Sequence, residues 1–451
     1  MFQSINPFDN SVVAEYTPFS ESQLRLALQR AERAYASWRK TPLPHRAALL
    51  RHAADVLLRR RDSLARLVTT EMGKALHESR AEVEKCAAGL TYYAEHGETL
   101  LRPERRDSDA ASGSYVRFDP LGPVLAVMPW NFPLWQVVRF AAPTLLAGNV
   151  GLLKHASNVC GCALALESVF REAGFPEGCF QSLLIDAKTA SALIADPVVR
   201  AVTLTGSEKA GSAVAAEAGR AIKKTVLELG GSDPFIVLAD ADVAIASKVA
   251  RQARLQNAGQ SCIAAKRFIV VRQVHDEFVQ EFIGGLAEYQ PADPLLDTTK
   301  MGPMARPDLV DDLEKQLQAS LEAGAELAAG GDRRGCLMPP LVLTGVRPGM
   351  AAFDEETFGP LAAVVEAYDD AHAIELANLS RYGLGAAIWT RDLEKAQRLA
   401  ADLESGNVFI NAMVKSVPSL PFGGVKQSGY GRELSDFGLR EFVNVRTVYI
   451  G

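Results

Sequence analysis

The first hundred residues carry apolar side chains at helical spacing. Between residues 20 and 40 these side chains fall on one face of a helix, and Ser20 and Gln23 have the spacing of a capping box. The same periodicity predicts a second helical block over 44–70 and a third over 77–97. We therefore expect the chain to begin with amphipathic helices.

After a polar stretch over 102–114, short apolar runs alternate with helical segments. The first runs are Val124–Met128, Gly151–Lys154, Ala201–Thr205 and Val226–Leu229, with helices such as Val159–Ala173 and Glu208–Gly219 between them. Beyond Pro234 the runs are Phe235–Leu238, Phe268–Val271, Ala362–Val365, Ala386–Trp389 and Val408–Asn411, with helices including Val243–Leu255 and Pro307–Ala323. Such alternation is typical of β-α-β units around a parallel sheet. We expect two α/β units.

Length and charge narrow the class of protein. The 451 residues exceed what one hydrophobic core usually holds, so two or more domains are predicted. With 48 basic and 54 acidic side chains the formal net charge is −6, which argues against nucleic-acid binding and favours a small-molecule partner. No apolar stretch of about 18 residues and no export signal is visible, so we expect no membrane association.

The cysteines point to a reducing compartment. Six cysteines in so long a chain are too sparse for a disulfide framework, which predicts reduced thiols and a cytoplasmic protein. Cys160 and Cys162 form a C-x-C pair on a predicted helix, where they face different directions, so no metal site is expected.

Two residues are candidates for covalent and acid–base chemistry. Cys262 lies in a Gly-containing turn between a predicted helix and a predicted strand, where substrate could reach its thiol. Glu228 lies in an apolar strand that ends in two glycines, where its carboxylate would be costly to bury unpaired. Taken singly, Cys262 also fits a buried structural thiol, and Glu228 also fits a carboxylate that points to water.

Two turns add candidate polar groups. Asn131, in the turn Pro129–Pro133, follows a predicted strand at the end of a parallel sheet where ligand sites gather, and its amide could face an oxyanion. The turn Thr205–Gly211 would let backbone N–H groups approach a phosphate at a helix N-terminus. A rigid proline turn and an ordinary helix cap explain these two segments equally well.

Taken together, the segments resemble the aldehyde dehydrogenase superfamily. The agreement runs from about Asn6 to the C-terminus, and its motifs are PWNFP at 129–133, LLK at 152–154, LTGS at 204–207, LELGG at 227–231, NAGQSC at 257–262, EETFGP at 355–360 and PFGGVKQSG at 421–429. Within it, the strings WNFPLWQV, LKHA, ELGGSDPFIVL and GRELSDFGL resemble short bacterial succinate-semialdehyde dehydrogenases. Seven ordered motifs at family-like separations make the structural readings of Cys262, Glu228 and Asn131 improbable.

The resemblance implies an α/β fold with a Rossmann-type cofactor domain, an α/β catalytic domain and a small β oligomerisation element. The implied limits are 1–100 and 119–230 for the NAD(P)-binding domain, 231–430 for the catalytic domain, and 101–118 with 431–451 for the oligomerisation element. In that element a hairpin is joined by the last strand, over about 445–450. A homodimer or homotetramer is expected.

The resemblance also implies catalytic roles. Cys262 would attack the aldehyde carbon, the Asn131 amide and the Cys262 backbone N–H would hold the oxyanion, and Glu228 would activate the water that hydrolyses the thioester.

On the cofactor, the family pattern assigns residues at both ends. Glu356 would hold the nicotinamide ribose, Phe358 would lie beside the nicotinamide with Trp130 nearby, and Gly206 and Ser207 would meet the pyrophosphate. Lys154 would reach the adenosine ribose. NAD-selective relatives often carry a Glu three residues after this lysine, whereas this chain has Ser157, so we predict that NADP is accepted alongside NAD or favoured over it.

The predicted substrate is succinate semialdehyde. Its carboxylate needs a cation beyond the reacting centre, and Arg139, two helical turns after Asn131, is the expected partner. Some semialdehyde enzymes carry an Arg six residues before the nucleophile, where this chain has Gln256. The further substrate-binding candidates are Trp135, Gln256 and Ser416, with help from Lys415. A salt bridge on a helix face is the alternative role for Arg139.

Three alternatives remain open from the sequence. One is a broad-specificity enzyme or one for another ω-carboxy aldehyde. A CoA-acylating dehydrogenase needs no general base, and Glu228 argues against it. A catalytically silent relative would lack the nucleophile, and Cys262 is present.

Overall fold

The N-terminal helices form where the apolar periodicity predicts them. In the computed structural model, which describes residues 1–109 and 112–451, helix α1 (Glu21–Trp38) begins with the predicted capping box. The Ser20 side chain accepts a hydrogen bond from the Gln23 N–H, and the Gln23 side chain accepts one from the Ser20 N–H. The predicted second block is two helices, α2 (Leu43–Arg59) and α3 (Arg61–Met72), because the backbone leaves helical geometry at Arg60.

The third predicted block is the long helix α4 (Leu76–Leu100). Ahead of the helices, β1 (Phe2–Ile5) and β2 (Val12–Tyr16) form an antiparallel hairpin. None of the helices in the two described ranges is long and apolar enough to cross a bilayer.

A six-stranded sheet forms the centre of the first α/β unit. Its strands, in spatial order, are β19 (Gly429–Tyr430), β9 (Lys224–Glu228), β8 (Ala201–Thr205), β5 (Pro123–Met128), β6 (Val150–His155) and β7 (Phe180–Ser182). All are parallel except β19, which pairs antiparallel with β9. Thus residues 429–430, predicted as part of the catalytic domain, belong to the sheet of the first α/β unit.

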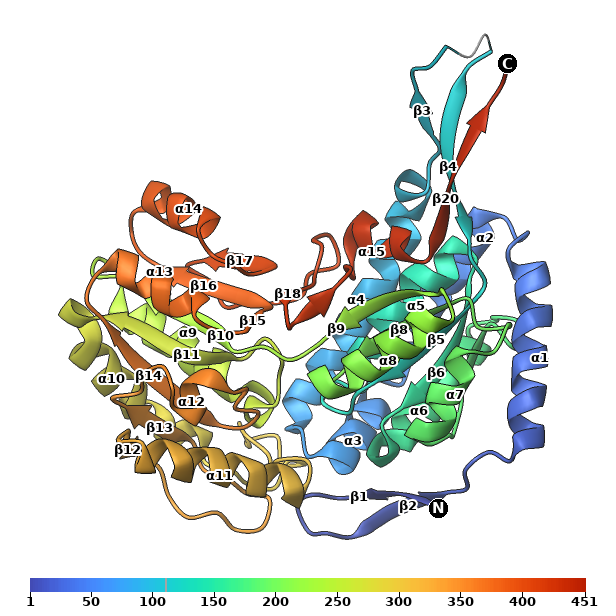
Figure 1. Cartoon of the computed structure of the whole chain (residues 1–451). Helices are drawn as coiled ribbons and strands as arrows, with labels where there is room; N and C mark the ends of the chain where they lie inside the picture. Colours follow the sequence, from blue (N-terminus) through green and yellow to red (C-terminus); the bar gives the residue numbers. More distant parts are fainter. Residues whose placement is uncertain (110–111) are drawn as a thin grey trace.

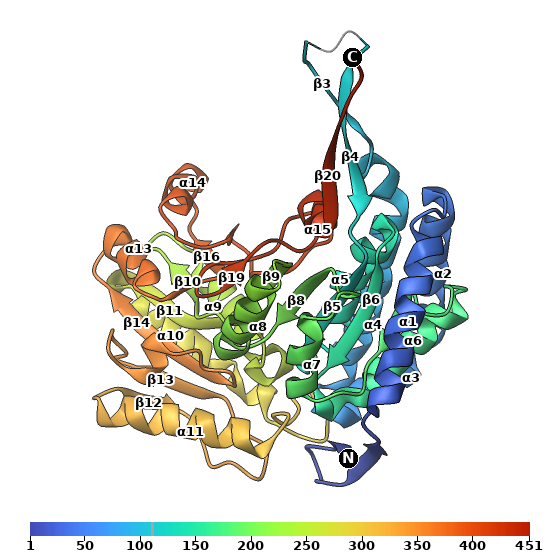
Figure 2. The same ribbon diagram turned by 45° about the vertical axis from the view of Figure 1, so that its right-hand side comes forward.

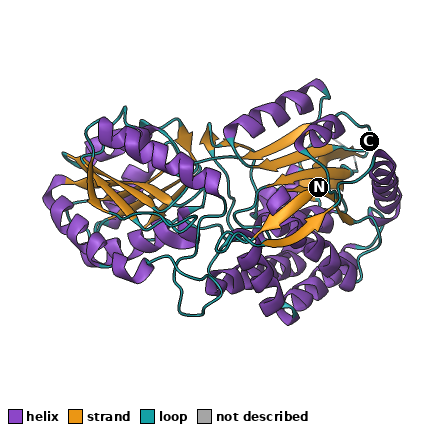
Figure 3. Cartoon of the chain, turned by 90° about the horizontal axis from the view of Figure 1, so that it is seen from below, coloured by secondary structure: helices purple, strands orange, loops and turns teal. Residues whose placement is uncertain are grey.

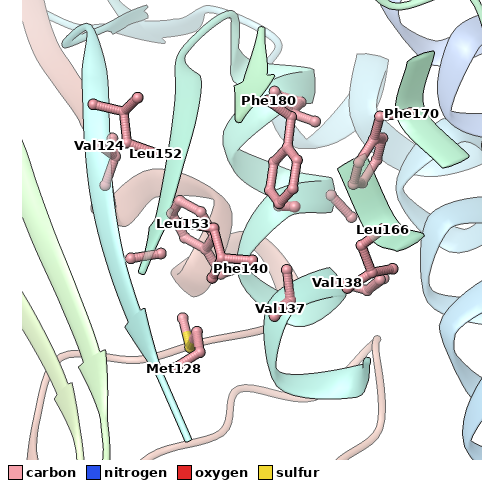
Figure 4. Packing of buried hydrophobic residues seen from close by; sticks show 14 of the residues in the cluster. Val124, Met128, Val137, Val138, Phe140, Leu152, Leu153, Leu166, Phe170 and Phe180 are labelled. Carbon is pink, nitrogen blue, oxygen red and sulfur yellow. The ribbon is translucent and has the colours of Figure 1, made fainter. Parts of the chain in front are cut away.

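Helices cover both faces of this sheet (Figure 3). They are α5 (Trp135–Ala147), α6 (Cys160–Glu172), α7 (Ala187–Ile194) and α8 (Glu208–Arg220), with a 3-10 turn η1 (Ser157–Val159) before α6. Strands β5 and β6 are nearly all apolar because both faces are buried. Figure 4 shows Leu153 of β6 beside Phe140 of α5, with Phe170 of α6 packed near Phe180.

The second α/β unit is built on a seven-stranded sheet. Its order is β12 (Glu326–Ala329), β13 (Leu341–Thr344), β14 (Leu361–Ala367), β11 (Ala265–Val271), β10 (Asp233–Val237), β16 (Gly385–Trp389) and β17 (Asn407–Ile410). Only β12 runs antiparallel to its neighbour. The helices of this unit are α9 (Val243–Leu255), α10 (His275–Gly284), α11 (Pro307–Glu322), α12 (Ala351–Asp354), α13 (Asp370–Asn378) and α14 (Leu393–Ala401).

Short elements complete this unit. They are β15 (Tyr382–Gly383) and β18 (Val425–Lys426), which pair with each other, and the 3-10 turns η2 (Gln256–Gly259), η3 (Arg272–Val274) and η4 (Leu286–Tyr289). Figure 1 shows the two α/β units side by side.

A three-stranded arm projects from the first unit (Figures 1 and 2). Strand β4 (Ser114–Pro120) lies between β3 (Glu104–Arg106) and β20 (Val443–Tyr449), which follows the short helix α15 (Ser435–Glu441). Both pairings are antiparallel, so the last strand joins the excursion as predicted. Residues 110–111 of the predicted excursion lie outside the described residues.

Candidate active site

A cavity of about 220 Å³ opens where the two α/β units meet. It is lined by Pro129, Trp130, Asn131, Gln136, Thr205, Gly206, Ser207, Leu229, Gly230, Cys262, Leu309, Glu356 and Phe358. The lining residues from Pro129 to Gly230 lie at or close to the carboxyl ends of β5, β8 and β9, the edge of a parallel sheet where ligands usually bind. The structure therefore brings the candidate nucleophile, the candidate oxyanion amide and most of the predicted cofactor residues to one cavity.

Asn131 is held by hydrogen bonds on both sides of its amide. Its Nδ2 donates to the Gln260 carbonyl at 3.0 Å, and its Oδ1 accepts from Gln136 Nε2 at 3.1 Å. Its own carbonyl accepts from Asn257 Nδ2 at 2.8 Å. Since a primary amide has two N–H groups, one donor of Asn131 is left for a ligand in the cavity.

His155 supports the Asn131 turn from behind. Its Nδ1 accepts from the Ala156 N–H at 2.9 Å, so its Nε2 carries the proton and donates to the Pro133 carbonyl at 2.8 Å. Burial lowers the pKa of His155 to about 4, which keeps the ring in this neutral state.

The turn before Cys262 has an unusual backbone. Asn257 and Ala258 have φ values of 54° and 52°, in the left-handed region that non-glycine residues rarely adopt. Gly259 also has positive φ, and a Cβ there would collide with the Gly359 carbonyl. The Asn257 N–H donates to both carboxyl oxygens of Glu78 on α4, each at 3.1 Å. The nucleophile turn is thus fastened to the N-terminal helices.

Cations surround the Cys262 thiol. The pKa of Cys262 is raised to about 12, mainly because the thiol is buried; the positive charges of Arg139 and Lys266 act to lower this pKa, and the negative charges of Glu356 and Glu228 act to raise it. Lys266 Nζ donates to the Cys262 carbonyl at 2.8 Å and lies 3.4 Å from Glu356 Oε1. The thiol is therefore protonated in the resting state, and its proton must leave when it attacks.

Glu228 ends β9 and is only 2% exposed. Neither of its carboxyl oxygens has a hydrogen-bond partner in residues 1–109 and 112–451. Burial raises the pKa of Glu228 well above its ordinary value, Glu433 raises it further, and Arg139 lowers it. A buried carboxyl without a partner costs free energy, so this group is poorly explained by a structural role and well suited to exchanging a proton.

Comparisons with known proteins agree with this geometry. The model of the Aldehyde dehydrogenase family matches residues 1–448. The chain belongs to this family.

Among its relatives, the succinate-semialdehyde dehydrogenase [NADP(+)] 1 of Mycobacterium bovis is 49% identical over 452 residues, covering 99% of each chain. The probable succinate-semialdehyde dehydrogenase [NADP(+)] of Synechocystis is 50% identical over 450 residues, again with 99% of each chain covered. The solved succinic semialdehyde dehydrogenase of Streptococcus pyogenes, in complex with NADP+, superposes with a TM-score of 0.97 at 38% identity over the whole of both chains.

On the cofactor side, this dehydrogenase has a row of polar groups. Ser207 caps α8 and, with Gly206, lines the cavity at the N-terminus of this helix. Glu356 accepts from the Gly231 N–H at 3.0 Å, and a Cβ at Gly230 would collide with its carboxylate. Trp130 and Phe358 meet edge to face, with ring centroids 5.8 Å apart.

Lys154 and Ser157 lie outside this cavity, at the end of β6 and at the start of η1. Lys154 is partly buried, and burial lowers its pKa. The two side chains thus lie three residues apart at the carboxyl end of a strand beside the strand that leads to Asn131.

On the substrate side, Arg139 is not the free cation that the sequence predicted. Its Nε forms an ion pair with Glu433, both side chains are almost fully buried, and its Nη2 lies 3.4 Å from Thr205 Oγ1. It also stacks over the Phe422 ring at 4.9 Å. Glu433 lies 294 positions away in the sequence, so helical spacing gave no sign of this neutralising partner.

The other substrate candidates do not all lie together. Trp135 Nε1 donates to Ser416 Oγ at 2.9 Å, so these two do come together. Gln256 begins η2, half-buried, and is absent from the residues that line the cavity in the described chain. Lys415, expected to help, is exposed.

Sequence reasoning missed three residues on one face of α4. Glu78 binds the nucleophile turn, Glu82 accepts from the Leu134 and Trp135 N–H groups at the start of α5, and Lys85 donates to Ser416 Oγ at 2.8 Å. Their spacing of four and three residues is a sign of one helix face, but it also fits a solvated face. Lys266 was missed too, although two adjacent cations within an apolar strand could have drawn attention to it.

Proposed function

We propose that this protein oxidises succinate semialdehyde to succinate with NADP as hydride acceptor. Family membership, together with the activities named for the relatives in Mycobacterium bovis, Synechocystis and Streptococcus pyogenes, supports the reaction and the cofactor. The observation that carries the proposal is a nucleophile-bearing cavity shared by Cys262 and Asn131, beside a buried carboxyl group, Glu228, with no hydrogen-bond partner in the described chain.

In this mechanism the Cys262 thiol gives its proton to solvent water as its sulfur attacks the aldehyde carbon. The free N–H of Asn131 donates to the developing oxyanion of the thiohemiacetal. Bound NADP would supply the hydride acceptor for this carbon, and loss of the hydride would leave the acyl group on the Cys262 sulfur as a thioester. Glu228, once ionised, takes a proton from water, which attacks the thioester and releases the acid with the free thiol.

The residues present fit a phosphorylated dinucleotide. Ser207 and the N-terminus of α8 offer N–H donors for a pyrophosphate, while the Gly206 N–H donates to the Glu228 carbonyl at 3.0 Å. Lys154 and Ser157 offer a cation and a hydroxyl for a 2′-phosphate, at a position where a carboxylate would repel it. Glu356 would accept hydrogen bonds from the nicotinamide ribose hydroxyls.

Initial rates of NADPH and NADH formation test the proposal, with succinate semialdehyde and with butanal as substrates. We expect NADP to support succinate semialdehyde oxidation at least as well as NAD, and Cys262→Ala to lose more than about a thousandfold in rate. The proposal fails if the purified protein oxidises neither aldehyde. Formation of an acyl-CoA instead of the free acid, when CoA is added, would assign the CoA-acylating reaction.

We further propose that the protein acts in the cytoplasm as a homo-oligomer. Its six cysteines are all free thiols, as a reducing compartment favours. The arm exposes Val445, Tyr449 and Ile450 away from the two α/β units, which suits pairing with a second copy. Light scattering of the purified protein measures the assembly, and a monomer at micromolar concentration would contradict it.

A further inference from the structure

A half-buried lysine lies beside the predicted substrate residues, without an ion-pair partner among the described residues. Lys85 Nζ donates to Ser416 Oγ at 2.8 Å and lies 4.5 Å from the centre of the Trp135 ring. No carboxylate pairs with it in residues 1–109 or 112–451, whereas its neighbours are paired: Lys74 with Glu82, and Arg139 with Glu433. A cation in this position is free to bind an anion.

Ser416 is arranged to help. Its hydroxyl oxygen accepts from both Lys85 Nζ and Trp135 Nε1, the latter at 2.9 Å. Because both of its lone pairs are then engaged, its own O–H proton must point to a third group. Lys85 keeps two further N–H donors. The cluster of Lys85, Ser416 and Trp135 therefore presents several donors and one uncompensated positive charge, which matches the two oxygens of a carboxylate.

Arg139 connects this cluster to the reacting centre. It follows Trp135 by one turn of α5, and its charge acts on both Cys262 and Lys85. Trp135 follows Asn131 by four residues, and its neighbour Gln136 lines the cavity and donates to Asn131 Oδ1, so the cluster lies at the start of α5 next to the cavity that holds Cys262. Arg139 itself is neutralised by Glu433, which leaves Lys85 as the unpaired cation at this end.

We propose that Lys85, together with the Ser416 hydroxyl, binds the distal carboxylate of the aldehyde and sets the preference for ω-carboxy aldehydes. This assignment rests on the proposed function and names the group that gives it specificity. Lys85 is a specificity-determining residue, with no part in the bond-making steps at Cys262.

The charge on Lys85 responds to pH in a useful range. Burial lowers its pKa to about 8, with Arg139 and Lys74 lowering it further and Cys86 and Glu82 raising it. Ser416 and Trp135 face it as uncharged groups. The lysine is charged below this pKa, so the preference for an acidic over a neutral aldehyde falls as pH rises through about 8.

The test compares kcat/KM for succinate semialdehyde and for butanal, a neutral aldehyde of equal length, with NADP. We expect Lys85→Met to lower the value for succinate semialdehyde about thirtyfold, mainly through KM, and the value for butanal by no more than about threefold. Lys85→Arg should restore part of the difference. Lys248→Met makes the same change at an exposed lysine of α9, in the other α/β unit, and is the control, expected to behave like the wild type.

The outcomes separate the two proposals. If Lys85→Met lowers kcat/KM equally for both aldehydes, or for neither, the role of Lys85 is overturned. The proposed function still stands in that case if the wild type prefers succinate semialdehyde. A wild type that oxidises butanal but not succinate semialdehyde overturns both. If Lys85→Met fails to fold, the wild-type ratio of the two kcat/KM values from pH 6.5 to 9.5 decides, since a ratio that stays constant contradicts the assignment.

Discussion

The sheets of the two α/β units each hold an ionisable side chain that is almost fully buried, but only one of these two side chains has hydrogen-bond partners. Arg267 on β11 is 1% exposed, and its guanidinium donates to the carbonyls of Ser232, Leu376 and Ala377 at 2.8 to 3.0 Å. Glu228 on β9 is 2% exposed and has no hydrogen-bond partner in the described chain. A buried cation that donates to several carbonyls ties elements together, whereas a buried carboxyl group without a partner is available for chemistry.

The position of Arg267 explains its partners. It joins the segment before β10 to the carbonyls at the end of α13, and it stacks over the Phe353 ring at 5.1 Å. A cation at a helix C-terminus is favoured by the helix dipole as well. Glu228, by contrast, lies at the strand end that leads directly into the cavity-lining Leu229 and Gly230.

The largest effect is expected for Glu228→Gln. The amide has nearly the same shape but takes no proton from water, so kcat should fall about 10²- to 10⁴-fold. Stopped-flow NADPH formation should still show a first-turnover burst, because thioester formation does not need Glu228. Thermal unfolding should be unchanged or slightly higher at neutral pH. A variant that keeps its turnover would remove Glu228 from the mechanism.

The wild-type pH profile carries the same comparison further. Glu228 acts only when ionised, and burial together with Glu433 raises its pKa well above its ordinary value. The rate should therefore increase with pH through that raised pKa, and an acidic limb at the position of an ordinary carboxylate would contradict it.

Arg267→Met should show the opposite pattern. Three carbonyls lose buried donors, so we expect the free energy of unfolding to fall by about 3 kcal/mol, while kcat of the folded enzyme changes less than about twofold. Urea unfolding with a parallel activity assay measures both. The control is Arg272→Met. The Arg272 side chain is 60% exposed and pairs with Glu366, another surface residue, so the free energy of unfolding should fall by less than about 1 kcal/mol. Equal losses of unfolding free energy in Arg267→Met and Arg272→Met would mean that Arg267 has no special structural role.

The same contrast explains how far the sequence could lead. Local signals predicted α1 with its capping box, and they predicted α9 and the strand β8 with their observed limits. These elements are determined by residues that lie close together in the sequence. The motif strings pointed to Asn131, Cys262 and Glu228. The partners of buried charges could not be found this way, since Arg139 meets Glu433 and Lys85 meets Ser416 across about 300 residues. Only the fold decides which buried charge is neutralised.

Glu78 lies between the two extremes and gives the smallest predicted effect. Among residues 1–109 and 112–451 its carboxylate has one hydrogen-bond partner, the Asn257 N–H, and that contact holds two residues with positive φ just before Cys262. Glu78→Ala should cost about 1 kcal/mol of stability and about fivefold in kcat, because the strained turn loses its anchor. Glu78→Gln keeps an acceptor and should retain activity within about twofold, measured by steady-state kinetics.

The pH dependence of stability separates this anchor from a simple packing role. Burial raises the pKa of Glu78 to about 7, above its value in the unfolded chain, so the folded state holds this proton more tightly. That stabilisation is complete at low pH and is lost as pH rises through about 7. Relative to Glu78→Gln, which cannot titrate, the wild type should therefore lose about 2.5 kcal/mol in unfolding free energy between pH 5 and pH 8. A constant difference across this range would mean that the carboxyl is as well solvated in the folded protein as in the unfolded chain, and the anchor would then work through shape alone.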